Sequence, residues 1–243
     1  MSESKLVFFK NQAFSVLILA FLQLLSIIIL NRLLDPEDFG LYALSSVFIV
    51  IAKMISEAGI GSALIQRNKL TNRFITSALT FSIFLYGLIS IIIIFFSYKI
   101  GEFYNDGRLT VVVRYLTIPF IIDGIVNIPK SLLLRKFEYI KLRYLNAISF
   151  FLGMVIIGNI LAYKSFGVWS IVYGQIFTSI ISLIIAHNFV RIKLSFTFNK
   201  SDYKDLLYFG GGITLSRIFN YFYVQGDKII LSSVYNFSVL GQF

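Results

Sequence analysis

The chain has 243 residues, of which 57% are hydrophobic and only 14% are charged. An ordinary soluble domain carries about 25% charged residues, so we expect a membrane protein. Lys and Arg outnumber Asp and Glu by 22 to 12, and in a membrane protein this excess indicates basic cytoplasmic loops rather than nucleic-acid binding. The absence of cysteine and the single histidine, His187, exclude thiolate chemistry and disfavour a metal centre. We therefore expect no metal, no cofactor and no nucleic-acid partner.

Seven apolar segments follow one another along the chain, each about long enough to cross a bilayer as a helix. Lipid requires backbone polar groups to bond internally, and unbroken apolar runs such as 91–96 lack the alternation of a β-barrel strand. The first segment lacks a small-residue cleavage site, so we interpret it as an uncleaved span. The sequence thus predicts an all-α, polytopic membrane helix bundle. Its spans lie at about residues 13–30, 39–55, 74–96, 111–134, 145–162, 168–189 and 209–231.

Basic residues are distributed unevenly between the two sides of these predicted spans. Fourteen of the 22 Lys and Arg residues share a side with the N-terminus, and four lie on the other side. Short cytoplasmic loops retain positive charge, so we expect a multi-pass membrane protein with a cytoplasmic N-terminus. The four residues of the less basic side are Arg32, Lys99, Arg108 and Lys164.

Polar side chains recur on one face of several predicted spans, at the spacing of a helix. Charges inside a span are costly and normally face the bundle interior or a water-filled cavity, so we expect a predominantly basic cavity. Lys53 and Glu57 are four residues apart and form one candidate ion pair, while Asp123 and Lys130 form another. The polar faces comprise Gln12, Ser15, Gln23 and Ser26; Asp123, Asn127 and Lys130; Gln175, Thr178, Ser179 and Ser182; and Arg217, Tyr221 and Lys228.

Each of these features also has a purely structural interpretation. Ser, Thr and Gln stripes join helices in membranes by hydrogen bonds. Arg114, Lys130 and Arg217 lie near the ends of predicted spans, where long side chains reach the lipid head groups. The pair formed by Lys53 and Glu57 is equally consistent with a structural ion pair.

Motifs of enzymatic catalysis are missing from the sequence. It contains no Walker loop, no G-x-S-x-G nucleophile elbow and no carboxylate pair in a loop of its own. A membrane-embedded polymerase or transferase would be expected to carry a large outer loop, and the longest predicted outer connection, about 97–110, is short. We therefore expect a non-enzymatic protein whose function resides among its helices.

Residues 31–42 read NRLLDPEDFGLY and residues 57–67 read EAGIGSALIQR. These stretches resemble the polysaccharide-transporter branch of the multidrug/oligosaccharidyl-lipid/polysaccharide exporter superfamily, the Wzx-type flippases of O antigen, capsule and exopolysaccharide. Residues 135–144, RKFEYIKLRY, are similar to the cytoplasmic loop that follows the fourth span in this family. The resemblance implies two six-helix lobes around a central cavity, with residues 1–206 as the first lobe and 207–243 as the start of the second.

The resemblance also implies a function, the outward flipping of undecaprenyl-diphosphate-linked oligosaccharide by alternating access, with glycosyltransferases or a polymerase as partners. A diphosphate crossing a low-dielectric barrier needs cationic contacts. The implied cavity ligands of the diphosphate are Lys53, Arg114, Lys130, Arg217 and Lys228. The implied candidates for a coupling proton or sodium ion are Glu57, Asp123 and Asp227.

Two alternatives remain open at the level of the sequence. One is a cation-coupled small-molecule exporter of the same superfamily, in which an acidic, aromatic-lined cavity would be expected. The other follows from the position of Phe243, directly after the turn that would lead to an eighth span. A single lobe would not enclose the cavity, so we expect a truncated or inactive lobe, or assembly of two copies.

Overall fold

The computed structural model describes residues 3–57, 59–192 and 198–208, with 219, 220 and 223, and this part of the chain is helical without a strand. Five helical stretches are long and apolar enough to span a membrane, and Leu17–Leu33 forms a shorter apolar helix. The all-α, multi-pass prediction is confirmed, while most of the seventh predicted span lies outside the described residues. The elements are α1 Glu3–Leu33, α2 Pro36–Glu57, α3 Ile60–Gln66, α4 Asn72–Phe103, α5 Gly107–Arg135, α6 Tyr139–Phe150, η1 Phe151–Gly158, α7 Asn159–Tyr163 and α8 Val168–Phe189.

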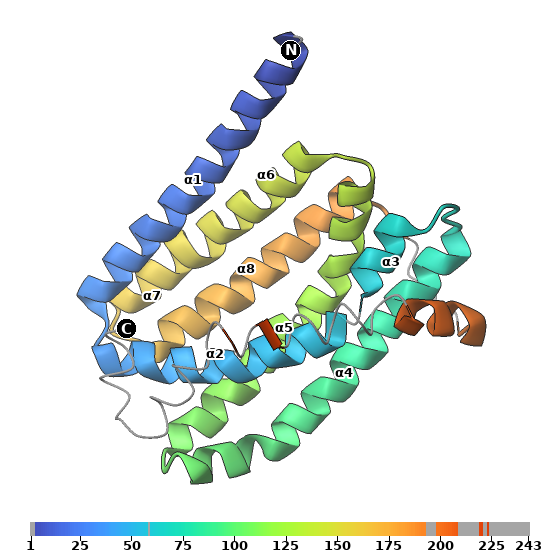
Figure 1. The fold of residues 1–243 in the computed structure, drawn as a ribbon. Coiled ribbons are helices and arrows are strands. Elements are labelled where there is room, and N and C mark those ends of the chain that lie inside the picture. The colour runs from blue at the N-terminus through green and yellow to red at the C-terminus, as the bar shows by residue number, and fades with distance from the viewer. Residues whose placement is uncertain (1–2, 58, 193–197, 209–218, 221–222, 224–243) are drawn as a thin grey trace.

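Helix α5 is the central element of the bundle, and it contacts α2, α3, α4, α6 and α8. Helix α4 forms a long antiparallel hairpin with α5, and α8 packs along another side of α5 (Figure 1). The continuous stretch α6–η1–α7 lies against α8, and α1 packs on that stretch (Figure 1). Consequently, α2, α6 and α8 all pack against α5, and their residues can line the spaces around this central helix.

The turn between α1 and α2 explains the first of the resembling stretches in physical terms. Pro36 is the first residue of α2, where its missing N–H costs no hydrogen bond. Phe39 and Tyr42 pack against a buried cluster that joins this turn to the helices beyond it. The stretch therefore builds a corner of the fold. The buried members of the cluster are Leu30, Leu34, Met154, Ala162 and Ile171.

The second resembling stretch spans the break between α2 and α3. Gly59 has a φ of 69°, a left-handed conformation that glycine adopts without steric cost, and α3 begins directly after it. The Arg135 guanidinium donates hydrogen bonds to the carbonyls of Leu64, Ile65 and Asn68. The bonds to Leu64 and Ile65 satisfy carbonyls in the last turn of α3, and the bond to Asn68 reaches the loop that follows. The apolar helical stretch that contains the predicted span 39–55 runs from Pro36 to Gln66.

A π-helix, η1, interrupts the predicted fifth span and brings it close to α8. Gly153 and Gly158 of η1 face Gly174 and Thr178 of α8, and a β-carbon at Gly158 would lie 3.4 Å from the Ser170 carbonyl. Small residues at such a crossing let two backbones approach closely, which drives helix packing in lipid. Isolated π-turns are frequent near functional sites, and this one fixes the position of α8.

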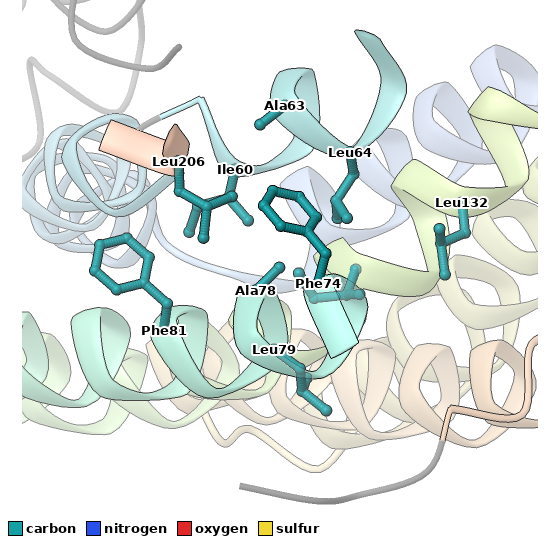
Figure 2. Close-up of a cluster of buried hydrophobic side chains, with 10 residues drawn as sticks. Ile60, Ala63, Leu64, Phe74, Ala78, Leu79, Phe81, Leu132 and Leu206 are labelled. Carbon is teal, nitrogen blue, oxygen red and sulfur yellow. The ribbon is translucent and has the colours of Figure 1, made fainter. Parts of the chain in front are cut away.

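Residues 200–208 form a short helix that docks on the bundle beside α3 and α4. Leu206 is fully buried in a cluster with residues of α3, α4 and α5 (Figure 2). The buried carboxylate of Asp202 accepts a hydrogen bond of 3.0 Å from the Ser77 hydroxyl, and Arg67 pairs with Asp205 at 2.9 Å. The short helix 200–208 is therefore anchored to the bundle by both apolar and polar contacts.

Candidate functional site

An ion pair joins α2 to α5 within the membrane-spanning part of the bundle. The Lys53 Nζ lies 2.8 Å from Asp123 Oδ2, and the Ser179 hydroxyl of α8 donates to Asp123 Oδ1 at 3.0 Å. The Asp123 side chain is 21% exposed and that of Lys53 is 42% exposed. One carboxylate thus holds three helices together while its lysine partner remains accessible.

Two small cavities adjoin this ion pair. One of 160 Å³ lies between α5, α6 and α8, and Asp123, Lys130 and Gln175 are among its lining residues. The second, of 110 Å³, lies on the side of α2 and includes Lys53, Asp123 and Gln175. Asp123 and Gln175 line both cavities and so separate them. Ligand pockets typically measure about 300–1,000 Å³, so each cavity fits water or a single small ion rather than a sugar.

Polar side chains dominate the larger of these two cavities. Ser182 of α8 lines it, and within the described part of the chain its buried hydroxyl has no hydrogen-bond partner. Buried hydroxyls are normally bonded to protein or water, so this one indicates a wet cavity. The other polar lining residues are Asn146, Ser149, Gln175, Thr178 and Ser179.

The structure brings together four of the predicted charged residues. Lys130 shares a cavity with Asp123, and both Lys53 and Lys130 lie within electrostatic range of Glu57. Lys53 is bonded to Asp123 on another helix, a partner that the spacing along α2 does not indicate. Glu57 itself lines a third cavity of 150 Å³ between α2, α3 and α5. The salt bridge of Lys53 is thus to Asp123, and the assignment of these residues to a diphosphate or a coupling ion stays a prediction.

The remaining predicted residues lie elsewhere. Arg114 is exposed, and its Nε donates at 2.8 Å to the Ser97 hydroxyl of α4. Its role as a diphosphate ligand stays a prediction. Arg217, Asp227 and Lys228 lie outside the described residues. In the first-span polar face, Ser26 is buried and Gln23 is exposed, which does not favour a continuous cavity lining there.

Asn146 and Ser149 of α6 are site residues that the sequence did not single out. They are three residues apart, so they share a face of α6, and both line the cavity next to Lys130. Two polar positions are a weak signal in a span that also contains other polar residues. Among the described residues, no cluster of three or more His, Asp or Glu side chains is placed to hold a metal ion.

The arrangement allows the two members of the ion pair to exchange charged partners. The Asp123 carboxylate accepts hydrogen bonds from both a lysine and a serine, and charge-assisted hydrogen bonds of this kind are stronger than neutral ones. An anion entering near Lys53 competes with Asp123 for the ammonium, and a cation competes with Lys53 for the carboxylate. The pair is therefore suited to link the binding of an anion to the binding of a cation.

Several known proteins are similar in sequence to this chain. The chain is 26% identical to an uncharacterized membrane protein in the cps region of Klebsiella pneumoniae over 85% of this chain and 42% of that protein. It is 22% identical to lipopolysaccharide biosynthesis protein WzxC of Escherichia coli K12 over 96% of this chain and 48% of the relative. Succinoglycan biosynthesis transport protein ExoT of Rhizobium meliloti is 24% identical over 91% of this chain and 45% of its own length.

The chain thus spans about half the length of these curated relatives. No solved structure matches it. The family described as polysaccharide biosynthesis protein matches residues 29–243, which include α2 to α8 and every charged residue of the cavities described above. This multi-pass membrane protein therefore belongs to the polysaccharide biosynthesis protein family.

Proposed function

We propose that the protein is a membrane transporter that flips undecaprenyl-diphosphate-linked oligosaccharide outward for surface polysaccharide synthesis. The observation that carries this proposal is the convergence of Lys53, Lys130 and Asp123 between the spans. Cations held in a low-dielectric site interact strongly with phosphate oxygens. Family membership and the biosynthetic names of two relatives support the same class of substrate.

The ion pair suggests how substrate and coupling ion alternate. Binding of the diphosphate to Lys53 withdraws the ammonium from Asp123, and the freed carboxylate then takes up a proton or sodium ion. Release of the diphosphate restores the pair and expels the cation. Lys130 lines the adjoining cavity on the other side of Asp123 and adds a second cation near the anion site. Glu57 lies close enough to affect both lysines.

The architecture proposed for the whole protein has two lobes. Residues 1–206 form the first lobe and 207–243 open the second, and the two alternate between inward-open and outward-open states around the lipid-linked sugar. The two cavities beside the Lys53–Asp123 pair are too small for an oligosaccharide, so we propose that both lobes together enclose the glycan. Arg217, Lys228 and Asp227 are proposed to extend the charged lining from the second lobe.

A complementation assay tests this function against the exporter alternative. A strain that lacks its own flippase, and that makes a matching oligosaccharide, is expected to regain surface polysaccharide when it produces the protein containing this chain. Its susceptibility to cationic drugs should stay unchanged, because the site gathers two lysines. Drug resistance without surface polysaccharide would favour a cation-coupled small-molecule exporter instead.

We also propose that the protein lies in the bacterial inner membrane with its N-terminus in the cytoplasm. The chain contains no cysteine, so single cysteines can be labelled selectively. A membrane-impermeant maleimide should modify Lys164→Cys in intact spheroplasts and Lys69→Cys only after permeabilisation, because both side chains are exposed at opposite ends of the bundle. The reverse pattern would show the opposite orientation.

A further inference from the structure

A larger cavity lies away from the Lys53–Asp123 pair, at the basic end of the bundle. It measures 780 Å³ and is bounded by the start of α4, the end of α5 and the residues that follow α8. These three helix ends lie at the same end of the bundle (Figure 1). Its volume falls within the range of about 300–1,000 Å³ that is typical of ligand pockets. Neither Lys53 nor Asp123 lines it, so it is separate from the proposed transport site.

The lining of this basic pocket, as described, contains four cationic side chains and no carboxylate. They are Arg73, Arg135, Lys136 and Arg191. Arg135 is held by the carbonyls at the end of α3, and Arg73 reaches Asp202 at 3.5 Å. Lys136 and Arg191 are exposed and form no salt bridge with any described residue. The pocket thus offers two cations to an external anion.

The same pocket also has an apolar lining. Leu70, Ile75, Leu132, Val190 and Ile192 lie among the four cations. The pocket is at the ends of membrane-spanning helices, where lipid head groups meet water. A ligand that uses both parts of the lining carries a phosphate and a hydrocarbon chain. Inorganic phosphate would leave the apolar side chains without a contact.

We propose that this pocket binds the phosphate head group of an anionic phospholipid of the cytoplasmic leaflet. Basic pockets between transmembrane helices on the cytoplasmic side take anionic lipid head groups in other membrane proteins. Lys136 and Arg191 donate to the phosphate, and Leu132 and Ile192 contact the first part of the acyl chains. The bound lipid joins α4, α5 and the residues after α8, beside the docked helix 200–208.

Native mass spectrometry of the purified protein containing this chain tests the proposal, with phosphatidylglycerol as the probe and phosphatidylcholine as the neutral reference. The double variant Lys136→Gln and Arg191→Gln is expected to weaken phosphatidylglycerol binding by about tenfold. The control, Lys69→Gln with Lys204→Gln, removes two exposed cations that do not line the pocket. It should leave the affinity unchanged.

Three results would overturn the proposal. The first is equal loss of phosphatidylglycerol binding in both double variants, which would indicate a general effect of net charge. The second is unchanged binding in the Lys136 and Arg191 variant. The third is displacement of the lipid by inorganic phosphate at equal concentration, which would assign the pocket to a free anion. Because surface polysaccharide is not the readout, failure here is distinguishable from failure of the flippase assignment.

Discussion

Replacing Lys53 with alanine is expected to reduce surface polysaccharide on the order of tenfold or more, the effect of losing a charge-assisted hydrogen bond. The substitution removes the ammonium that lies 2.8 Å from Asp123 and that we assign to the diphosphate. Quantitative blotting of surface polysaccharide in the complemented strain gives the measurement. Lys53→Arg keeps a cation and should retain part of the activity.

Removing Lys53 also leaves Asp123 without its ionic partner, which by itself destabilises a bundle. The double variant Lys53→Ala with Asp123→Asn separates the two effects, because it leaves neither charge unpaired. We expect normal protein levels and no recovery of surface polysaccharide. Recovery in the double variant would instead show that the pair is only structural. Lys99→Ala on the exposed surface of α4 is the control and should retain full activity.

Replacing Gly153 with alanine is expected to destabilise the protein by about 1–3 kcal/mol, the usual cost of overpacking. A β-carbon at Gly153 would lie 2.6 Å from the Thr178 Cα, and backbone cannot yield as a flexible side chain can. The π-helix and α8 must therefore separate. Because Ser179 follows Thr178, the shift also moves the hydroxyl that donates to Asp123.

Thermal unfolding of the detergent-solubilised protein measures this loss. Gly87→Ala on α4 is the matched control, because a β-carbon there would meet no side chain and no other helix within 4 Å. Glycine within a helix is less favourable than alanine by about 0.5–1 kcal/mol, so the control should keep or slightly raise the melting temperature. An equal fall in both variants would contradict the close crossing of η1 and α8.

The spans themselves were predictable from the sequence because lipid leaves helices as the solution for long apolar segments. The polar face of Gln175, Ser179 and Ser182 was also predictable, since helical spacing alone places these residues together. Both predictions depend only on the order of residues within a single helix. The concentration of cations on one side of the predicted spans could also be read directly from the sequence. Three of these cations, Arg73, Arg135 and Arg191, line one pocket.

The partners across helices could not be predicted in this way. Lys53 has Glu57 one turn away on its own helix, yet its bond to Asp123 depends on how α2 packs against α5. The π-helix at 151–158 was equally hidden, because its sequence is as apolar as that of an α-helical span. The basic pocket depends on three helix ends meeting, and its cations are scattered over more than a hundred residues of sequence.

The location of lipid-linked oligosaccharide in the inner membrane tests the central assignment most directly. A sugar-specific lectin added to spheroplasts detects only the glycan on the outer face. Cells that produce the protein should expose lipid-linked oligosaccharide to the lectin. Cells that lack the protein should accumulate the same lipid in the inner leaflet, which the lectin cannot reach. Equal lectin labelling with and without the protein, at equal total lipid-linked oligosaccharide, would contradict the flippase function.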